Sequence, residues 1–188
     1  MDDYKEMIFR CVREAIESGR WGDLTKFSAE FTAYWIGEEL PPSAFEPLLA
    51  VLEWPEIHAC PYSLGYFRIF TVFWNGFTPE QYARVGEALC KCLDKLVDLM
   101  ARYCLMEHLL MHPASHSRLE YARRFAASPD PDTRRWLGAV INGAIAVGDI
   151  SQEDRQQFRP VLEALLHDPS QEVRDSALDV MQRLENKM

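Results

Sequence analysis

The stretch DPSQEVRDSALDV, residues 168–180, decides the fold of this chain. It aligns with SPDPDTRRWLGAV, residues 128–140, at a constant shift of 40 residues. In both stretches a turn that carries proline and an acidic residue opens a helical pattern. An arginine follows in the second turn, Arg134 in one copy and Arg174 in the other. A further helical stretch precedes each copy, so the sequence predicts two consecutive helix pairs in the C-terminal part.

This pattern resembles the HEAT-repeat family, whose helix pairs have about this period. The second helix of a HEAT unit opens with a D-P-S-x-x-V-R-x-x-A type sequence, which residues 168–177 match closely. The upstream copy departs from it with Thr133 in place of Val and Leu137 in place of Ala. The resemblance covers residues 113–184, and it implies antiparallel helix pairs stacked as an α-solenoid.

Helical patterns also fill residues 1–112, and no run of alternating β-branched residues indicates a sheet. Helices are expected over about residues 3–18 and 23–36, closed by Gly19 and Gly37, which readily take the left-handed conformation. We therefore predict an all-α protein of about eight or nine helices in a single domain, residues 1–188. Residues 1–112 form its acidic, aromatic-rich part, and residues 113–188 form its HEAT-like part.

The longest regular pattern runs from Tyr82 to Leu110, with apolar residues at alternating spacings of three and four over about four heptads. It predicts one long helix. Additional apolar residues at Leu93, Val97 and Met100 widen the stripe and favour a central core helix. A coiled-coil homodimer, in which the chain acts as a structural module, is the alternative.

Composition narrows the class of protein. The chain has 188 residues, of which 48% are hydrophobic and 26% charged, as in a globular domain. No secretory signal and no uncharged apolar segment of membrane-spanning length is present, so we expect no membrane association and a cytoplasmic location. The five cysteines include no C-x-x-C pair and indicate free thiols in a reducing compartment.

The net charge is -9, which disfavours nucleic-acid binding because polyanions are held mainly by Lys and Arg. A basic protein is the natural partner of such a chain.

Few residues in the sequence suggest metal binding or catalysis. Cys104, His108 and His112 follow each other at intervals of four, with Glu107 and His116 nearby, as in a zinc site. Three ligands spread over two helical turns cannot all reach one tetrahedral ion, so we predict no metal and no cofactor. Because the usual motifs of nucleophilic, metal-assisted and nucleotide chemistry are also absent, we predict a protein that is not an enzyme.

One enzyme class is an alternative, because alkylpurine DNA glycosylases are built from HEAT-like repeats and use Trp, Asp and Arg on a concave face. The residues that would imitate this set are Trp136, Arg134, Asp175 and Arg174. A HEAT-like modifying lyase is a related alternative. Residues 113–188 carry 10 Lys and Arg against 12 Asp and Glu, whereas a glycosylase grips DNA through a basic groove. We expect the two arginines to make internal hydrogen bonds and to pair with acids of the adjacent turn, as in HEAT-like stacks.

The most unusual local feature is a cation-free stretch: no Lys or Arg occurs between Lys26 and Arg68. Six glutamates and several aromatic residues fall there, and aromatic anchors within a charged rim are typical of a protein interface. In the alternative interpretation, the aromatics are core residues and the glutamates an ordinary solvated face. The candidate partner-binding residues are Trp35, Glu38, Glu39, Glu53, Trp54 and Glu56.

These observations predict an inhibitor or adaptor that binds a basic protein through an acidic, aromatic surface. In size, charge and lack of accessory domains the chain resembles bacterial immunity proteins that neutralise nuclease-type toxins. This resemblance implies a toxin domain as the partner, with the chain acting as a monomer or a homodimer.

Overall fold

The computed structural model describes residues 4–72, 76–111, 118–147 and 152–186. These ranges are all-α: they contain eleven α-helices, one short 3-10 helix and no strand. The all-α class is therefore confirmed, while the helix count exceeds the eight or nine predicted. Within the described ranges, no helix is long and apolar enough to cross a membrane.

The chain divides into two compact units, Met1–Leu105 and Met106–Met188, and α7 contains the boundary. The helices that begin in the first unit are α1 (Tyr4–Ser18), α2 (Gly22–Trp35), α3 (Pro42–Val51), α4 (Pro55–His58), α5 (Leu64–Val72), α6 (Pro79–Cys92) and α7 (Leu99–Met111). Those of the second unit are α8 (Arg118–Ala126), α9 (Pro131–Val147), α10 (Gln152–Leu165) and α11 (Gln171–Asn186).

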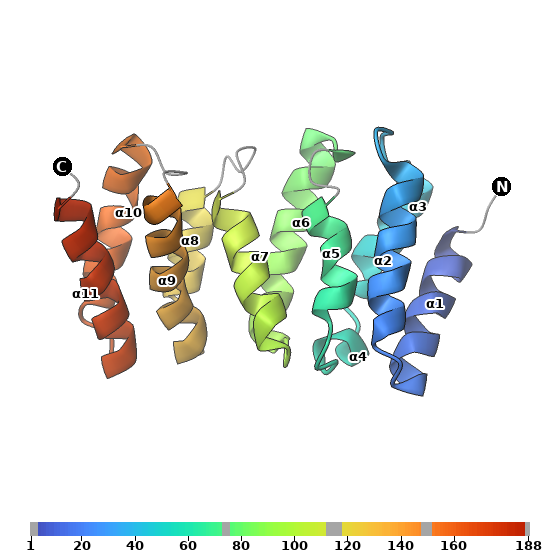
Figure 1. Cartoon of the computed structure of the whole chain (residues 1–188), viewed down its shortest axis with the longest axis horizontal. Helices are drawn as coiled ribbons and strands as arrows, with labels where there is room; N and C mark the ends of the chain where they lie inside the picture. The colour runs from blue at the N-terminus through green and yellow to red at the C-terminus, as the bar shows by residue number, and fades with distance from the viewer. Residues whose placement is uncertain (1–3, 73–75, 112–117, 148–151, 187–188) are drawn as a thin grey trace. The chain divides into compact units, whose positions relative to one another are not determined.

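In the first unit, α2 packs against α1 and α5, and α3 packs against α1 and α6 (Figure 1). The α2–α5 contact is close because Gly65 has no side chain: a Cβ there would lie 2.8 Å from Thr25 Oγ1. Ser28 of α2 donates a hydrogen bond to the carbonyl of Gly65. Tyr66, which is fully buried, donates to the carbonyl of Leu48 at 2.7 Å and joins α5 to α3.

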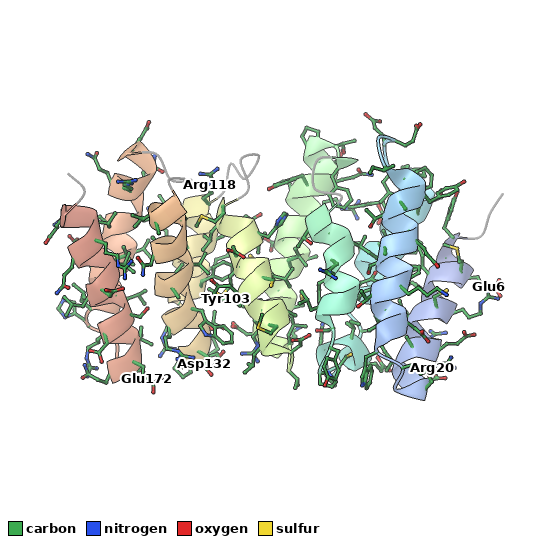
Figure 2. The ribbon with its side chains drawn as sticks, in the orientation of Figure 1. Glu6, Arg20, Tyr103, Arg118, Asp132 and Glu172 are labelled. Carbon is green, nitrogen blue, oxygen red and sulfur yellow. The ribbon has the colours of Figure 1, made fainter. Side chains whose placement is uncertain are left out.

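The predicted helix ends at Gly19 and Gly37 are confirmed. Both glycines have a positive φ, 67° and 81°, which other residues adopt only at a cost. The α1–α2 turn contains Arg20, labelled in Figure 2, which pairs with Asp23 at 3.1 Å.

The structure has two helices where the heptad pattern predicted one. α6 ends at Cys92, a 3-10 turn covers Leu93–Lys95, and α7 begins at Leu99. Asp98 explains the new start: its Oδ1 accepts hydrogen bonds from the amides of Met100 and Ala101, both at 3.1 Å, and so caps α7.

The other carboxylate oxygen of Asp98 serves a second helix. Its Oδ2 accepts a hydrogen bond from the amide of Leu64, the first residue of α5, at 2.8 Å. The Asp98 side chain is buried, and it provides acceptors for the amide donors that helix N-termini leave unpaired. One carboxylate therefore fixes the starts of α5 and α7 together.

The second unit contains both helix pairs that the 40-residue shift predicted. α8 packs on α9 and α10 on α11, while α8 also contacts α10 and α9 contacts α11. Figure 2 shows Arg118 at one end of this unit and Asp132 and Glu172 at the other. Because Arg118 begins α8 and Asp132 lies in the first turn of α9, these two helices are antiparallel.

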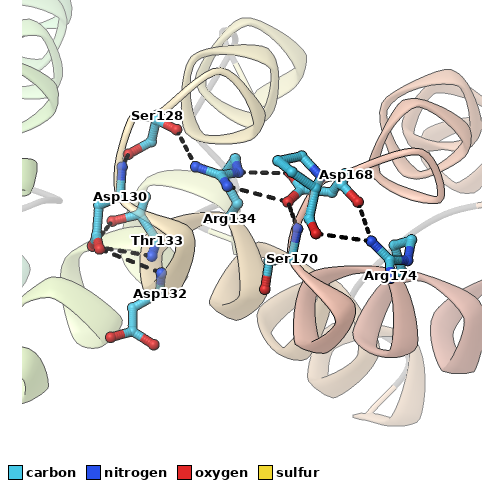
Figure 3. A network of polar contacts seen from close by, with 9 residues as sticks. Ser128, Asp130, Asp132, Thr133, Arg134, Asp168, Ser170 and Arg174 are labelled. Atoms are coloured by element: carbon cyan, nitrogen blue, oxygen red, sulfur yellow. Dashed lines mark hydrogen bonds and ion pairs between the residues drawn. The ribbon is translucent and has the colours of Figure 1, made fainter.

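Arg134 and Arg174 both make the internal hydrogen bonds that the sequence predicted (Figure 3), but among the described residues the predicted ion pair with an acid is formed by Arg134 alone. Arg134 donates to the carbonyl of Ser128 at 2.7 Å, and Arg174 donates to the carbonyl of Asp168 at 2.5 Å. These two bonds are equivalent under the 40-residue shift. Arg134 also forms an ion pair with Asp168 of the next helix pair, at 2.6 Å.

Close packing between the two pairs depends on Gly138. A Cβ at this position would lie 2.3 Å from the hydroxyl oxygen of Ser176 in α11. That hydroxyl donates a hydrogen bond to the carbonyl of Arg135 at 3.0 Å, so it has little freedom to move away.

Candidate protein-binding surface

The six candidate residues lie at the two ends of α3. Trp35 ends α2, and Glu38 and Glu39 follow in the loop that leads to α3. The other three residues lie in the turn after α3 and in the short helix α4, at the opposite end (Figure 1). The ten residues of α3 span roughly 15 Å at 1.5 Å per residue. The candidates therefore form two groups, which we call the α2–α3 end (Trp35, Glu38, Glu39) and the α3–α4 end (Glu53, Trp54, Glu56).

All four candidate glutamates are exposed, and in the described part of the chain none of them forms an ion pair. The two other glutamates of the cation-free stretch, Glu30 and Glu46, do form ion pairs. Glu46 accepts two hydrogen bonds from Arg84, at 2.6 and 2.8 Å, which lower the pKa of the Glu46 carboxyl. Glu30 lies 3.8 Å from Lys26. The four candidate carboxylates are therefore available to pair with a cation of a partner.

At the α3–α4 end, cations from other helices approach the candidates. The guanidinium of Arg13 lies 5.0 Å from the centre of the Trp54 ring, and Phe9 packs edge-on against the same ring at 4.9 Å. Glu53 lines a hollow of about 550 Å³ together with the cationic residues Arg84, Lys91 and Lys95. A basic partner would meet like charges here, and Trp54 is already engaged by an intramolecular cation–π contact.

At the α2–α3 end, the aromatic residues surround a groove between α1 and α2. This α1–α2 groove has a volume of about 490 Å³. Its lining consists of Tyr4, Met7, Cys11, Phe27, Glu30, Phe31, Tyr34 and Trp35, with no Lys, Arg or His among these described residues. Burial raises the pKa of the Cys11 thiol, so this group is uncharged at neutral pH. The groove is therefore apolar with one acidic side chain.

The end of α2 adds negative potential beside this groove. The last carbonyls of a helix carry partial negative charge, and the last turn of α2 contains no basic residue. The carbonyl of Trp35 accepts a hydrogen bond from the loop, donated by the amide of Glu38 at 3.0 Å. Glu38 and Glu39 lie in the loop that follows α2. Their carboxylates and the carbonyls at the end of α2 therefore both attract cations to the α2–α3 end.

Two large apolar residues at the end of α2 are exposed. Tyr34, which lines the groove, is 70% exposed, and Ile36, which follows Trp35, is 76% exposed. Trp35 is half-buried between Tyr4 and Tyr34, with ring centres 5.9 and 5.2 Å away, and its indole Nε1 has no hydrogen-bond partner in the described structure. Large exposed apolar residues beside a groove are typical of binding surfaces.

The sequence predicted Trp35 as a partner-binding residue, but it did not predict the groove that Trp35 lines. Phe27, Phe31, Tyr34 and Trp35 follow each other at spacings of four, three and one, which places them on one face of α2. That spacing was the available signal. The contribution of Tyr4 from α1 had no local signal, because it depends on how α1 packs against α2.

The possible zinc ligands do not form a site in the described part of the chain, where no group of three His, Cys, Asp or Glu side chains is placed to hold a metal ion. Cys104, Glu107 and His108 lie on α7. His112 and His116 lie outside the described residues.

The residues that would imitate a glycosylase site are engaged in internal contacts. Arg134 and Arg174 hold carbonyls and the Asp168 carboxylate, as described above. Asp175 accepts a hydrogen bond from Gln171 at 2.6 Å, and the guanidinium of Arg135 lies 6.0 Å from the ring centre of Trp136. Within this set, Arg134 links the two helix pairs through Asp168, and the contacts just described for the other three residues are local.

The heptad residues are likewise used inside the chain. Those that the structure buries are Tyr82, Val85, Leu89, Cys92, Leu96, Met106 and Leu110. Leu99 is exposed, together with Val97 and Met100. Because most of the heptad residues are covered within the chain, they are not free to pair with a second copy as a coiled coil.

Comparisons of this chain with protein-family models, curated proteins and solved structures found no match. The function must therefore be inferred from the surface itself.

Proposed function

We propose that this chain is a protein-binding inhibitor or adaptor whose partner is a basic protein. One observation carries the proposal: at the α2–α3 end, the exposed carboxylates of Glu38 and Glu39 follow shortly after Trp35, which lines an aromatic groove. Negative charge around an apolar anchor site steers a basic partner and then holds it by burial of apolar surface. Among basic partners we favour a nuclease-type toxin domain, because its inhibitor can occupy the surface that otherwise binds nucleic acid.

The scaffold is part of the same proposal. We propose that the helix pairs α8–α9 and α10–α11 are two HEAT-like repeats of an α-solenoid. The 40-residue shift supports this assignment, as does the Arg134–Asp168 ion pair between the two helix pairs. The proposed role needs no catalysis and no cofactor. Five free cysteines suit a reducing compartment, and we propose a cytoplasmic location on that ground.

The test is capture of a partner by the full-length tagged chain in its native cell, followed by binding measurements with the purified partner. We expect a basic protein whose affinity falls as salt rises. Reversing Glu38, Glu39, Glu53 and Glu56 to Lys should weaken binding at least about a hundredfold, because charge reversal replaces attraction by repulsion.

A matched control reverses four exposed glutamates of the second unit, Glu153, Glu163, Glu172 and Glu185, and gives the same net charge. Binding that survives the first reversal, or that falls equally in the control, would contradict the proposed surface. Circular dichroism of each variant establishes that its helices are retained.

A further inference from the structure

We infer that the α1–α2 groove receives one large apolar side chain of the basic partner, and that an Arg or Lys flanking this side chain pairs with Glu38 and Glu39. This inference rests on the proposed function and makes it more specific. It selects the α2–α3 end over the α3–α4 end as the binding site, and it states the chemistry of the segment that binds.

The apolar part of the inference follows from the groove lining. Aromatic rings from both α1 and α2 form its walls, as Tyr4, Phe27 and Phe31 illustrate. The volume of about 490 Å³ has room for the side chain of a Phe, Leu or Met residue. Burial of such a side chain is the main source of affinity at protein interfaces, and well-packed pockets with aromatic walls are the usual place for it.

The cationic part follows from charge complementarity. Glu38 and Glu39 follow shortly after Trp35, and the end of α2 contributes partial negative charge. Glu30 lines the groove as well, but it already pairs with Lys26 at 3.8 Å. No described Lys, Arg or His lines the groove, in contrast to the α3–α4 end, where Arg13 covers Trp54. An apolar residue without flanking cations would fit the walls but would gain nothing from these carboxylates.

Exposed apolar residues at the end of α2 complete the proposed site. Tyr34 lines the groove and Ile36 follows Trp35; both are exposed in the free chain, and we infer that a partner seated in the groove covers them. Apolar residues that surround an anchor exclude water from it and so strengthen the charge pairs at its edge. The structure therefore assigns the anchor to the groove, the cation to Glu38 and Glu39, and the water-excluding contacts to Tyr34 and Ile36.

The experiment uses the full chain and three synthetic helical peptides. The first has one Phe flanked by two Arg residues; in the second, Ala replaces the Phe; in the third, Glu replaces both Arg residues. Affinity is measured by fluorescence anisotropy at low salt. We expect the first peptide to bind, and each replacement to weaken binding by about tenfold or more.

Two matched double variants locate the site. E38K/E39K and E53K/E56K make the same change in net charge, in the same unit, at opposite ends of α3. We expect the first to weaken binding of the Phe-containing peptide by about tenfold and the second by less than about threefold. Tyr34→Ala should weaken it as well, whereas Leu178→Ala, which removes an exposed apolar side chain of the second unit, should not.

A direct readout comes from the indole N–H signals in NMR spectra of the full chain. The signal of Trp35, assigned by its loss in Trp35→Phe, should shift when the Phe-containing peptide is added, and that of Trp54 should stay in place.

Equal effects of the two double variants, a shift at Trp54 alone, or no peptide binding would overturn the inference. A cellular partner that still depends on the four glutamates would then preserve the proposed function. Concentration-dependent dimerisation that displaces the peptide would instead assign the groove to a second copy of the chain, and would overturn the inference too.

Discussion

Arg134 and Asp168 form a two-bond ion pair between consecutive helix pairs of the second unit. Nε and Nη2 of Arg134 donate to the two carboxylate oxygens of Asp168, at 2.6 and 3.1 Å. The side chains are only 12% and 6% exposed. Each has a further partner, since Arg134 also donates to the carbonyl of Ser128 and Asp168 also accepts from the amide of Ser170. Protein groups therefore provide hydrogen-bond partners for both charged side chains.

Removing the charge of Asp168 should destabilise the chain. We expect Asp168→Asn to lower the free energy of unfolding by about 3 kcal/mol, because it leaves a mostly buried guanidinium without its counter-ion. Urea denaturation of the full chain measures this. Glu163→Gln is the control, since Glu163 pairs with Arg159 at 2.9 Å on an exposed surface and should contribute less than about 0.5 kcal/mol. Equal losses in both variants would contradict a special role for the Asp168 pair.

The same pair should make stability depend on pH. The hydrogen bond from Arg134 lowers the pKa of the Asp168 carboxyl, and the amide of Ser170 lowers it further. A carboxyl whose pKa is lower in the folded state stabilises the fold above its unfolded pKa, about 3.9, and this contribution is lost as pH falls through the folded pKa. The difference in unfolding free energy between the native chain and Asp168→Asn should thus be constant near neutral pH and shrink below about pH 4. A difference that grows on acidification would contradict the assignment.

Two glycines of α9 should respond in opposite ways to the same substitution. Gly138→Ala places a Cβ against the Ser176 hydroxyl and should cost about 1–3 kcal/mol through overpacking. Gly143→Ala meets no atom within 4 Å and should stabilise the helix by up to about 1 kcal/mol. Thermal and urea denaturation of both variants test this. Adding Ser176→Ala to Gly138→Ala should recover part of the loss, and a lack of recovery would locate the strain elsewhere.

Asp98 should contribute more than an ordinary helix cap. We expect Asp98→Ala to lower the unfolding free energy by about 3 kcal/mol, because it leaves amides at the starts of both α5 and α7 without their acceptor. Thr78→Ala is the comparison, since Thr78 caps only α6 and should cost about 1 kcal/mol. Urea denaturation of the two variants measures the difference. Similar losses would mean that the bond to Leu64 adds nothing.

Local signals in the sequence predicted the all-α class and the two C-terminal helix pairs. The resemblance to HEAT-like stacks also predicted the internal hydrogen bonds of Arg134 and Arg174, which reach equivalent carbonyls, while the predicted pairing with an acid is shown for Arg134. The break between α6 and α7 was missed because the apolar spacing continues through it: Leu93 and Leu96 are buried as they would be in an unbroken helix. Asp98 was the signal for a helix start, but its second bond, to Leu64, depends on tertiary packing.

The candidate surface was predictable only in part. A stretch without cations in the sequence need not be free of cations in space, and Arg13 and Arg84 reach it from α1 and α6. Glu39 and Glu53 belong to the same acidic run, yet α3 separates them. The sequence identified the acidic residues correctly as exposed, while their division into two groups follows from the direction of one helix.

Gly138 limits how this chain can change over evolution. Every other amino acid adds a Cβ, so each substitution at this codon brings an atom against α11. Under the 40-residue shift its counterpart is Leu178, which is 48% exposed and faces no such restriction. The two copies of the repeat should therefore differ in mutational tolerance, with position 138 more restricted than position 178.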